Sequence, residues 1–240
     1  MSDLAGFFAE NGYCVVRQLF APEEMSKLEG EFDRIVRQCE PVDETGLIST
    51  RNVHQYSGLW MSTILDPRLL DRVEELIGPD IVLNHTTLFQ KERTSHVGPF
   101  RMHQDWSYLP TVGDTMIGAM LHVSDSTEEM GCLRLYPGSH KRGRIEASSA
   151  NDEAFHEQFS FDEATPVEAV PGDVTFFHYC TVHGSESNRS ERPRKVVFVR
   201  MFSGKDHKED ANRFCENLVL RGWNYHASPS NTTQVLWQPK

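Results

Sequence analysis

Apolar positions near the start of the chain predict helices. Between Pro22 and Val36, apolar residues recur three or four positions apart, which is the period of one helix face. Pro22 suits the first helical position, and a similar pattern over residues 66–77 ends at Gly78-Pro79. A short helix is also predicted over residues 5–12. We expect these helices, which lie within residues 3–38 and 66–77, to brace a sheet.

The rest of the apolar pattern predicts strands. Short runs rich in β-branched and aromatic residues alternate with turns that contain Pro, Gly, Asn or Asp. About eight runs fit this description: 13–16, 81–89, the stretch around 103–105, 116–123, 131–136, 167–170, 174–178 and 196–202. Leading helices followed by many short strands predict a mainly β fold with flanking helices, whose core is a double-stranded β-helix of the jelly-roll or cupin type.

Three stretches have no clear apolar period. Residues 39–60 suggest a long loop or short irregular strands over a site, and residues 140–165 suggest a surface excursion. Residues 41–62 and 140–165 are the two candidates for a lid. The tail, 205–240, suggests a cap or a partner surface. Because the chain has 240 residues and no internal repeat, we expect one domain over residues 1–240.

Composition narrows the class of protein. A formal charge of −11 argues against a nucleic-acid partner, since phosphate binding needs a basic surface. No apolar run approaches the roughly 20 residues of a membrane span, and the first residues lack the basic start of a signal peptide. The five cysteines are scattered, as expected of reduced thiols. We therefore expect a cytoplasmic protein with a small-molecule substrate, no membrane or nucleic-acid partner, and room for a homodimer.

His103 and Asp105 are the first candidate metal ligands. They are two residues apart in an extended segment, so their side chains point to the same side of it. An imidazole and a carboxylate are two of the three ligands in the 2-His-1-carboxylate triad that binds non-haem Fe(II) and leaves coordination positions open. Alone, the pair is a weak signal, because the chain has eleven histidines. The hypothesis therefore needs a second histidine brought close by the fold.

His183, 80 positions further along, is the candidate for that ligand. It opens a loop that leads to a strand with a basic cluster, Arg192, Arg194 and Lys195. An acidic co-substrate needs a counter-charge for its far carboxylate, and a guanidinium offers two parallel hydrogen bonds. Arg194 is the first choice and Arg192 the competing one, with Ser185 as a hydroxyl donor. His178 is the most plausible false ligand.

The residues around these positions resemble the phytanoyl-CoA dioxygenase family of Fe(II)/2-oxoglutarate oxygenases. The resemblance covers residues 1 to about 203 and rests on these segments: Leu88-Phe89-Gln90-Lys91, His103-Gln104-Asp105, the run from Gly131 to His140, Gly172-Asp173, and His183-Gly184-Ser185 followed by Asn188, Ser190 and Arg194.

The resemblance implies roles for individual residues. In the family, the His-x-Asp pair and the later histidine bind iron, which places His103, Asp105 and His183 as metal ligands and catalytic residues. It also favours Arg194 over Arg192 for the distal carboxylate of 2-oxoglutarate, and it suggests cofactor contacts from Ser185 and Thr87. Because Asp105 is retained, the chain resembles the oxygenating members rather than the halogenating ones. The implied cofactors are Fe(II), 2-oxoglutarate and O2, and the implied reaction is hydroxylation or a related C–H oxidation of a small metabolite.

Two other functions fit parts of the pattern. A cupin-like module could hold a metal or small ligand without turnover, although three ligands together with Arg194 argue against it. A zinc hydrolase would need a further carboxylate as general base, and none stands out. The basic run 141–144 could receive an anionic substrate tail, but a solvated loop is the simpler interpretation. Succinate formation separates an oxygenase from a binding module.

Overall fold

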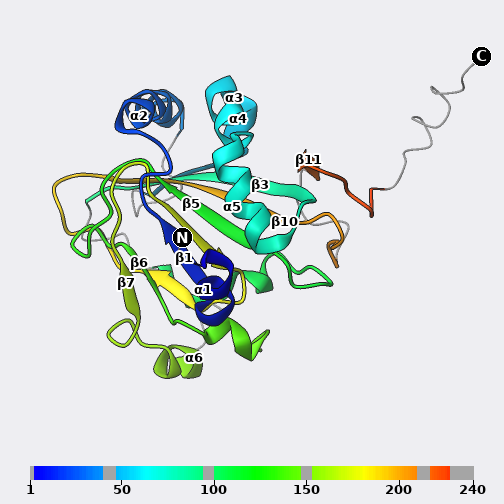
Figure 1. Ribbon diagram of the computed structural model, residues 1–240. Coiled ribbons are helices and arrows are strands. Elements are labelled where there is room, and N and C mark those ends of the chain that lie inside the picture. The colour runs from blue at the N-terminus through cyan, green and yellow to red at the C-terminus, as the bar shows by residue number, and fades with distance from the viewer. Residues whose placement is uncertain (1–2, 40–46, 94–99, 147–152, 210–216, 228–240) are drawn as a thin grey trace, which may run out of the picture.

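Two antiparallel sheets dominate the computed structural model, which describes residues 3–39, 47–93, 100–146, 153–209 and 217–227 (Figure 1). The larger sheet has seven strands in the order β1-β8-β5-β10-β3-β11, with β2 also paired to β3. Its strands are β1 (Tyr13–Val16), β2 (Leu47–Arg51), β3 (Ile81–Lys91), β5 (Ile117–His122), β8 (Val174–His178), β10 (Arg194–Ser203) and β11 (Leu218–Arg221). The smaller sheet has the order β4-β9-β6-β7, from β4 (Phe100–His103), β9 (His183–Ser185), β6 (Leu133–Leu135) and β7 (Thr165–Val167).

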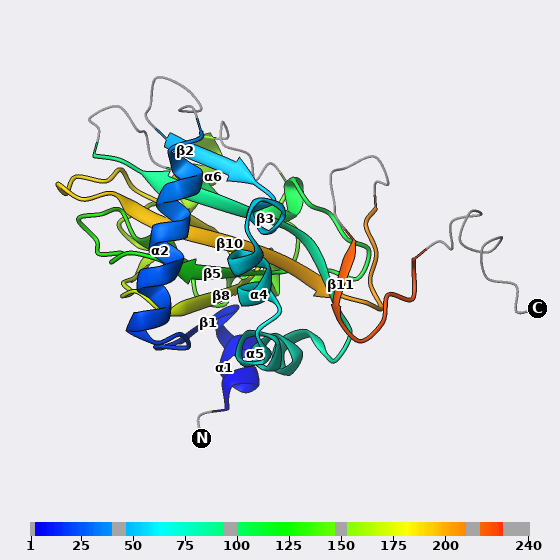
Figure 2. The same cartoon turned by 90° about the horizontal axis from the view of Figure 1, so that it is seen from above.

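Helices cover one face of the larger sheet. Figure 2 shows α2 running across its strands, with α4 and α5 beside it. Phe32, Trp60 and Leu69 from these helices are fully buried in one core cluster that also contains Val197 and Val199 of β10. The helices are α1 (Leu4–Asn11), α2 (Pro22–Val36), α3 (Val53–Tyr56), α4 (Gly58–Ile64), α5 (Pro67–Ile77) and α6 (Glu153–Gln158), with short 3-10 turns at Asp105–Ser107 and Ser139–Arg142.

Side chains alternate between the two faces of the larger sheet, so the residues that do not face the helices face the smaller sheet. Along β10, Val197 and Val199 pack on the helices, whereas Phe198 and Arg200 line a cavity between the two sheets. Lys195 follows the helix-facing side and pairs with two carboxylates of α2 at 2.7 and 2.9 Å. The larger sheet therefore presents an apolar face to the helices and a partly polar face to the cavity.

The predicted fold class is confirmed, with differences in the irregular stretches. The segment 39–60 contains β2, α3 and part of α4, and the segment 140–165 contains α6. Phe155 and Phe159 are buried with Met102 and Val182, so this excursion covers the smaller sheet. In the tail, β11 extends the larger sheet by pairing with β3. Residues 40–46, 147–152, 210–216 and 228–240 of these predicted segments lie outside the described residues.

None of the helices in the described ranges has the length and apolar character needed to cross a bilayer.

Phe32→Ala tests the packing between α2 and the sheet. The side chain is fully buried, so its removal leaves a cavity, and we expect the free energy of unfolding to fall by about 3–5 kcal/mol. Lys27→Ala, an exposed change on the same helix, is the matched control and should stay within about 0.5 kcal/mol of wild type. Urea unfolding measures both variants, and equal midpoints would contradict this packing.

Candidate metal centre and cofactor cavity

His103, Asp105 and His183 converge at one point between the sheets. Strand β4 pairs with β9 so that His103 lies directly opposite His183. The Nε2 atoms of His103 and His183 are 3.5 and 3.8 Å from Oδ1 of Asp105. One ligand atom from each residue lies within 4.8 Å of the others, and within the described chain no other group of three His, Cys, Asp or Glu residues is arranged in this way.

The His-x-Asp segment is not one continuous strand, which corrects the sequence-based expectation. Strand β4 ends at His103, and Asp105 begins a 3-10 turn. Gln104 between them still has extended backbone angles, with φ −112° and ψ 140°. This single extended residue keeps the carboxylate on the same side as the imidazole.

Both imidazoles are oriented by the backbone. Nδ1 of His103 hydrogen-bonds the carbonyl of Arg101 at 2.7 Å, and Nδ1 of His183 hydrogen-bonds that of Thr181 at 2.8 Å. Because a carbonyl oxygen only accepts hydrogen bonds, Nδ1 carries the proton in each ring. Nε2 is then left with its lone pair, the state in which an imidazole binds a metal.

The electrostatics of the site favour the same protonation states. Burial alone would raise the pKa of Asp105, but the charge of the Arg200 guanidinium holds it well below its usual value. Arg200 approaches Oδ2 of this carboxylate through Nε and Nη2, both at 3.3 Å. Burial, and then the neighbouring His103, lowers the pKa of His183 to about 4. Asp105 is therefore ionised and His183 neutral near pH 7, as metal ligation requires.

A cavity of about 670 Å³ opens beside the three residues. Its walls come from both sheets and combine phenylalanines and other apolar residues with four arginines. The lining residues are Ser49, Arg51, His85, Thr87, Phe89, Phe100, Arg101, His103, Asp105, Tyr108, Leu109, Met120, Leu133, His183, Gly184, Ser185, Arg194, Phe198 and Arg200.

Arg194 is a buried cation without a counter-charge. Its side chain donates to the carbonyl of Gly131, whereas Nε is buried without a partner. It forms no ion pair with any residue of the described chain, and burial lowers its pKa to about 10. A buried unpaired charge is costly, so this guanidinium is suited to an anion that enters the cavity.

Ser185 and Thr87 also line the cavity. The Ser185 hydroxyl accepts a hydrogen bond from Nζ of Lys91 at 2.8 Å, which leaves its own proton free to be donated. Burial and the charge of Arg194 lower the pKa of Lys91 to about 6. Thr87 lies on β3 opposite Phe198.

The three residues of the predicted basic cluster, Arg192, Arg194 and Lys195, lie in three different environments. Only Arg194 enters the cavity. The Arg192 side chain is 71% exposed and pairs with Asp125 at 3.0 Å, and Lys195 faces α2. His178, the alternative ligand, hydrogen-bonds the carbonyl of Asp114 through Nε2 and the amide of Cys180 through Nδ1, so both ring nitrogens are used.

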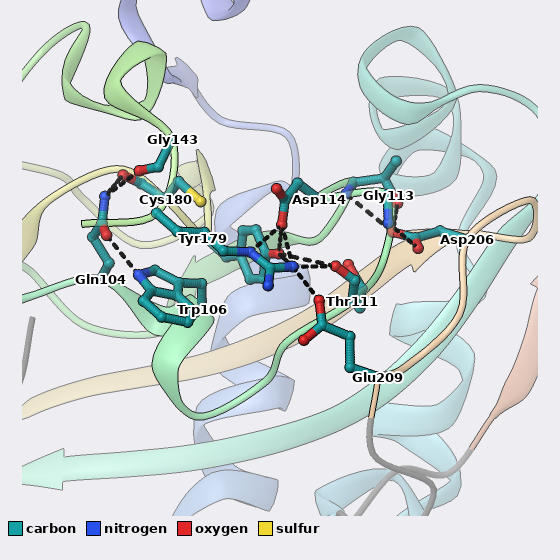
Figure 3. Close-up of polar contacts among 12 residues, drawn as sticks. Gln104, Trp106, Thr111, Gly113, Asp114, Gly143, Tyr179, Cys180, Asp206 and Glu209 are labelled. Carbon is teal, nitrogen blue, oxygen red and sulfur yellow. Dashed lines mark hydrogen bonds and ion pairs between the residues drawn. The ribbon is translucent and has the colours of Figure 1, made fainter. Parts of the chain in front are cut away.

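Gln104, the middle residue of the motif, ties the two halves of the site together (Figure 3). Its fully buried amide donates to the carbonyls of Cys180 at 2.6 Å and Gly143 at 3.0 Å. Its oxygen accepts from the Trp106 indole at 2.7 Å and from the backbone of Ile145 at 2.9 Å. The turn before His183 is thus bonded directly to the residue between His103 and Asp105.

Sequence reasoning missed three cavity-side residues: Arg200, His85 and Lys91. Alternation along the strands could have found them, since 194, 198 and 200 share one face of β10, and 85, 87, 89 and 91 share one face of β3. The basic run 141–144 is used structurally, as Lys141 pairs with Glu10 and Arg144 with Asp114 and Glu209.

Comparison with known proteins shows which family this chain resembles. The phytanoyl-CoA dioxygenase (PhyH) family matches residues 8–196. Mouse peroxisomal phytanoyl-CoA dioxygenase is 28% identical over 80% of this chain and 65% of that protein, so the chain spans slightly less than two thirds of this relative. A probable alpha-ketoglutarate-dependent hypophosphite dioxygenase of Stutzerimonas stutzeri is 24% identical over 80% of this chain and 75% of that protein.

Solved structures share the fold. The non-haem alpha-ketoglutarate-dependent epimerase SnoN from nogalamycin biosynthesis superposes with a TM-score of 0.76 at 20% identity, over 91% of this chain and 97% of that chain. Iron-bound EctD from S. alaskensis gives a TM-score of 0.74 at 19% identity, over 92% and 86% of the two chains. Because the family match extends over most of its length, this chain belongs to the phytanoyl-CoA dioxygenase family.

Proposed function

We propose that the protein is an Fe(II)/2-oxoglutarate-dependent oxygenase that hydroxylates, or otherwise oxidises at a C–H bond, a small organic metabolite. The observation that carries this proposal is the meeting of two imidazoles and one carboxylate beside a cavity that also contains the buried, unpaired Arg194. In this assignment His103, Asp105 and His183 hold the iron, and Arg194 binds the distal carboxylate of 2-oxoglutarate.

The residues of the site fit both the iron and the 2-oxoglutarate of this proposal. Three ligands on one side leave the remaining coordination positions open to the cavity. The Ser185 hydroxyl, held by Lys91, is placed to donate to the same carboxylate as Arg194, and Thr87 contributes a second hydroxyl on the cavity wall. When bound, iron and 2-oxoglutarate supply the oxidation, in which O2 converts 2-oxoglutarate to succinate and CO2 and its second oxygen atom is transferred to the substrate.

The protein's own part is to position the ligands and exclude water. The backbone carbonyls at Arg101 and Thr181 fix the imidazole rings, Arg200 holds the second oxygen of Asp105, and Gln104 joins the two segments. Phenylalanines and Met120 form the apolar part of the wall, which keeps water away from the reacting atoms.

The cellular compartment and the oligomeric state of the protein remain predictions. Four described cysteines are free thiols, which supports a reducing compartment such as the cytoplasm. Burial raises the pKa of Cys14 and Cys180 to about 12, so these thiols are unreactive. A homodimer is compatible with this proposal and is tested by the mass of the protein in solution.

Succinate formation distinguishes the oxygenase from a cupin-like binding module. With Fe(II), 2-oxoglutarate and O2, we expect the wild type to form succinate, and His103→Ala and Asp105→Ala to fall to background because each loses a metal ligand. His207→Ala, which changes an exposed histidine away from the cavity, is the control and should keep wild-type turnover. Metal and 2-oxoglutarate binding without succinate, over a broad substrate panel, would favour the module.

Arg194→Gln should weaken 2-oxoglutarate binding much more than metal binding. Loss of a charge-assisted pair in a buried site costs about 2–4 kcal/mol, which raises the dissociation constant about 30-fold to 900-fold. Calorimetric titration of the metal-loaded protein measures it, with Arg192→Gln as the matched surface control. Unchanged affinity in Arg194→Gln, together with a loss in Arg192→Gln, would assign the role to Arg192.

Gln104→Leu tests the link between the two halves of the site. The change preserves size but leaves the buried carbonyl of Cys180 and the Trp106 indole without partners, and each such group costs about 1–3 kcal/mol. We expect a lower free energy of unfolding and a metal affinity reduced about 10-fold to 100-fold. Wild-type metal affinity in a folded Gln104→Leu protein would show that the link does not position the ligands.

A further inference from the structure

His85 lines the cavity from strand β3, and its imidazole makes one hydrogen bond to the described chain. Nδ1 lies 2.5 Å from Oδ1 of the neighbouring Asn84, whose side chain is also buried. An amide oxygen accepts hydrogen bonds and has no proton to donate, so Nδ1 of His85 carries the proton of the ring. Nε2 is then left with its lone pair and can only accept a hydrogen bond.

This Nε2 atom has no partner in the described part of the chain. No described residue hydrogen-bonds to it, and the imidazole forms no ion pair with any of them. Nε2 is also not among the described polar atoms that the protein encloses completely without a partner. Because His85 is only 6% exposed and lines the cavity, its small exposed part opens into that cavity. The lone pair is therefore presented to whatever occupies the cavity.

The ring is neutral, so it acts as an acceptor and not as a cation. Burial, and then the charges of Arg200 and Arg51, lower the pKa of His85 to about 3. Near pH 7 Nε2 is thus unprotonated. Surroundings that oppose a proton on this imidazole also oppose an ammonium group placed beside it. The acceptor is therefore suited to an uncharged donor, such as a hydroxyl or an amide N–H.

The proposed co-substrate cannot supply that donor. 2-Oxoglutarate carries two carboxylates and a keto group, all of which accept hydrogen bonds near neutral pH. His85 is also distant from Arg194, since it is paired with Arg200 in the register of β3 and β10, whereas Arg194 is paired with Lys91, six residues further along β3. Arg200 contacts the metal ligand Asp105, so His85 lies at the end of the cavity where that carboxylate is held.

Apolar groups line the cavity beside this acceptor. Phe198 is two residues from Arg200 on the same face of β10, and the centre of its ring lies 4.8 Å from the Arg200 guanidinium. Phe89 packs edge to face against Phe198 with ring centres 5.8 Å apart, and Met120 belongs to the same cluster. A ligand that fits both features has an apolar body and an uncharged hydrogen-bond donor.

We propose that Nε2 of His85 accepts a hydrogen bond from a hydroxyl or amide N–H group of the substrate, and that this contact selects substrates with such a donor. The inference rests on the proposed function, because it takes the Arg194 end as occupied by 2-oxoglutarate and the substrate as lying beside the metal centre. His85 is in this assignment a specificity-determining residue, and Asn84 fixes its tautomer.

Matched probes that differ in the donor test this assignment. Diamagnetic Zn(II)-loaded protein is first titrated with 2-oxoglutarate, which tests the proposed function by itself. The saturated complex is then titrated with benzyl alcohol, 2-phenylethanol and cyclohexanol, and with the fluorides in which fluorine replaces the hydroxyl group. Fluorine is close to hydroxyl in size but has no proton to donate. Acetanilide and N-methylacetanilide form the amide pair. We expect at least one donor probe to bind more tightly than its partner, by about fivefold or more.

Nitrogen chemical shifts identify the atom that the donor contacts. In protein prepared with isotope-labelled histidine, the Nε2 resonance of His85 is assigned from its loss in His85→Gln. We expect the alcohols to shift this resonance in the wild type and the fluorides to leave it in place. The resonances of the exposed His207 are the internal control and should not move.

Variants locate the preference. His85→Leu removes the acceptor and should abolish the preference for the donor probe. His85→Gln, whose amide oxygen can accept a hydrogen bond, should retain part of it, and the exposed control His207→Ala should retain all of it. Metal and 2-oxoglutarate affinities are measured for each variant, so that loss of the metal centre is not mistaken for loss of this contact.

Three results would overturn the inference while leaving the proposed function intact. One is that no donor probe binds more tightly than its partner, which would leave water as the partner of His85. Another is a preference that survives in His85→Leu. The third is a preference in the wild type without any shift of the His85 Nε2 resonance, since the donor would then be bound by another group.

Discussion

The pairing of β4 with β9 is the constraint on which the site depends. Both strands are short, and their register places His103 opposite His183. Because side chains alternate along a strand, a slip by one residue would turn an imidazole away from the carboxylate. Gly184 permits this pairing, since a Cβ there would lie 2.6 Å from the carbonyl of Phe100. On its other edge β9 pairs with β6, which fixes His183 from both sides.

One face of the larger sheet provides the packing that stabilises the fold, and the other face carries the residues of the candidate site. The helix-facing side is a continuous apolar core, and burial of such surface is the main favourable contribution to folding. The cavity side buries the charged groups Arg194 and Asp105, and buried charges are costly unless a partner neutralises them. The fold tolerates this cost on one face because the other face supplies the packing. The same cost favours binding of ions that satisfy the unpaired groups.

Much of the fold follows from apolar periodicity. The helix at Pro22–Val36 and the strand at Tyr13–Val16 match their predicted ranges, because strong periodic patterns decide local structure. β9 was missed, since His183-Gly184-Ser185 has no apolar alternation and forms a strand only through its neighbours. The turn at Asp105 was missed for a related reason, as its backbone follows the contacts of Gln104 and Trp106.

The candidate site was predictable in part. Residue types and spacing, together with the family resemblance, identified three convergent residues and Arg194. They did not identify Arg200 or His85, which carry no motif and are found only by following strand alternation from Arg194 and Thr87 into the cavity. Nor could spacing show that Arg192, two residues from Arg194, lies on the surface, because the polar stretch before β10 has no regular period.

A crystal structure with Mn(II) and 2-oxoglutarate tests the central claim most directly, because anomalous scattering locates the metal independently of the protein model. We predict one peak within bonding distance, about 2.0–2.3 Å, of Nε2 of His103, Oδ1 of Asp105 and Nε2 of His183, with the far carboxylate of 2-oxoglutarate on Arg194. A metal bound elsewhere, or a site that stays empty at saturating Mn(II) with His183 turned away from Asp105, would contradict the account.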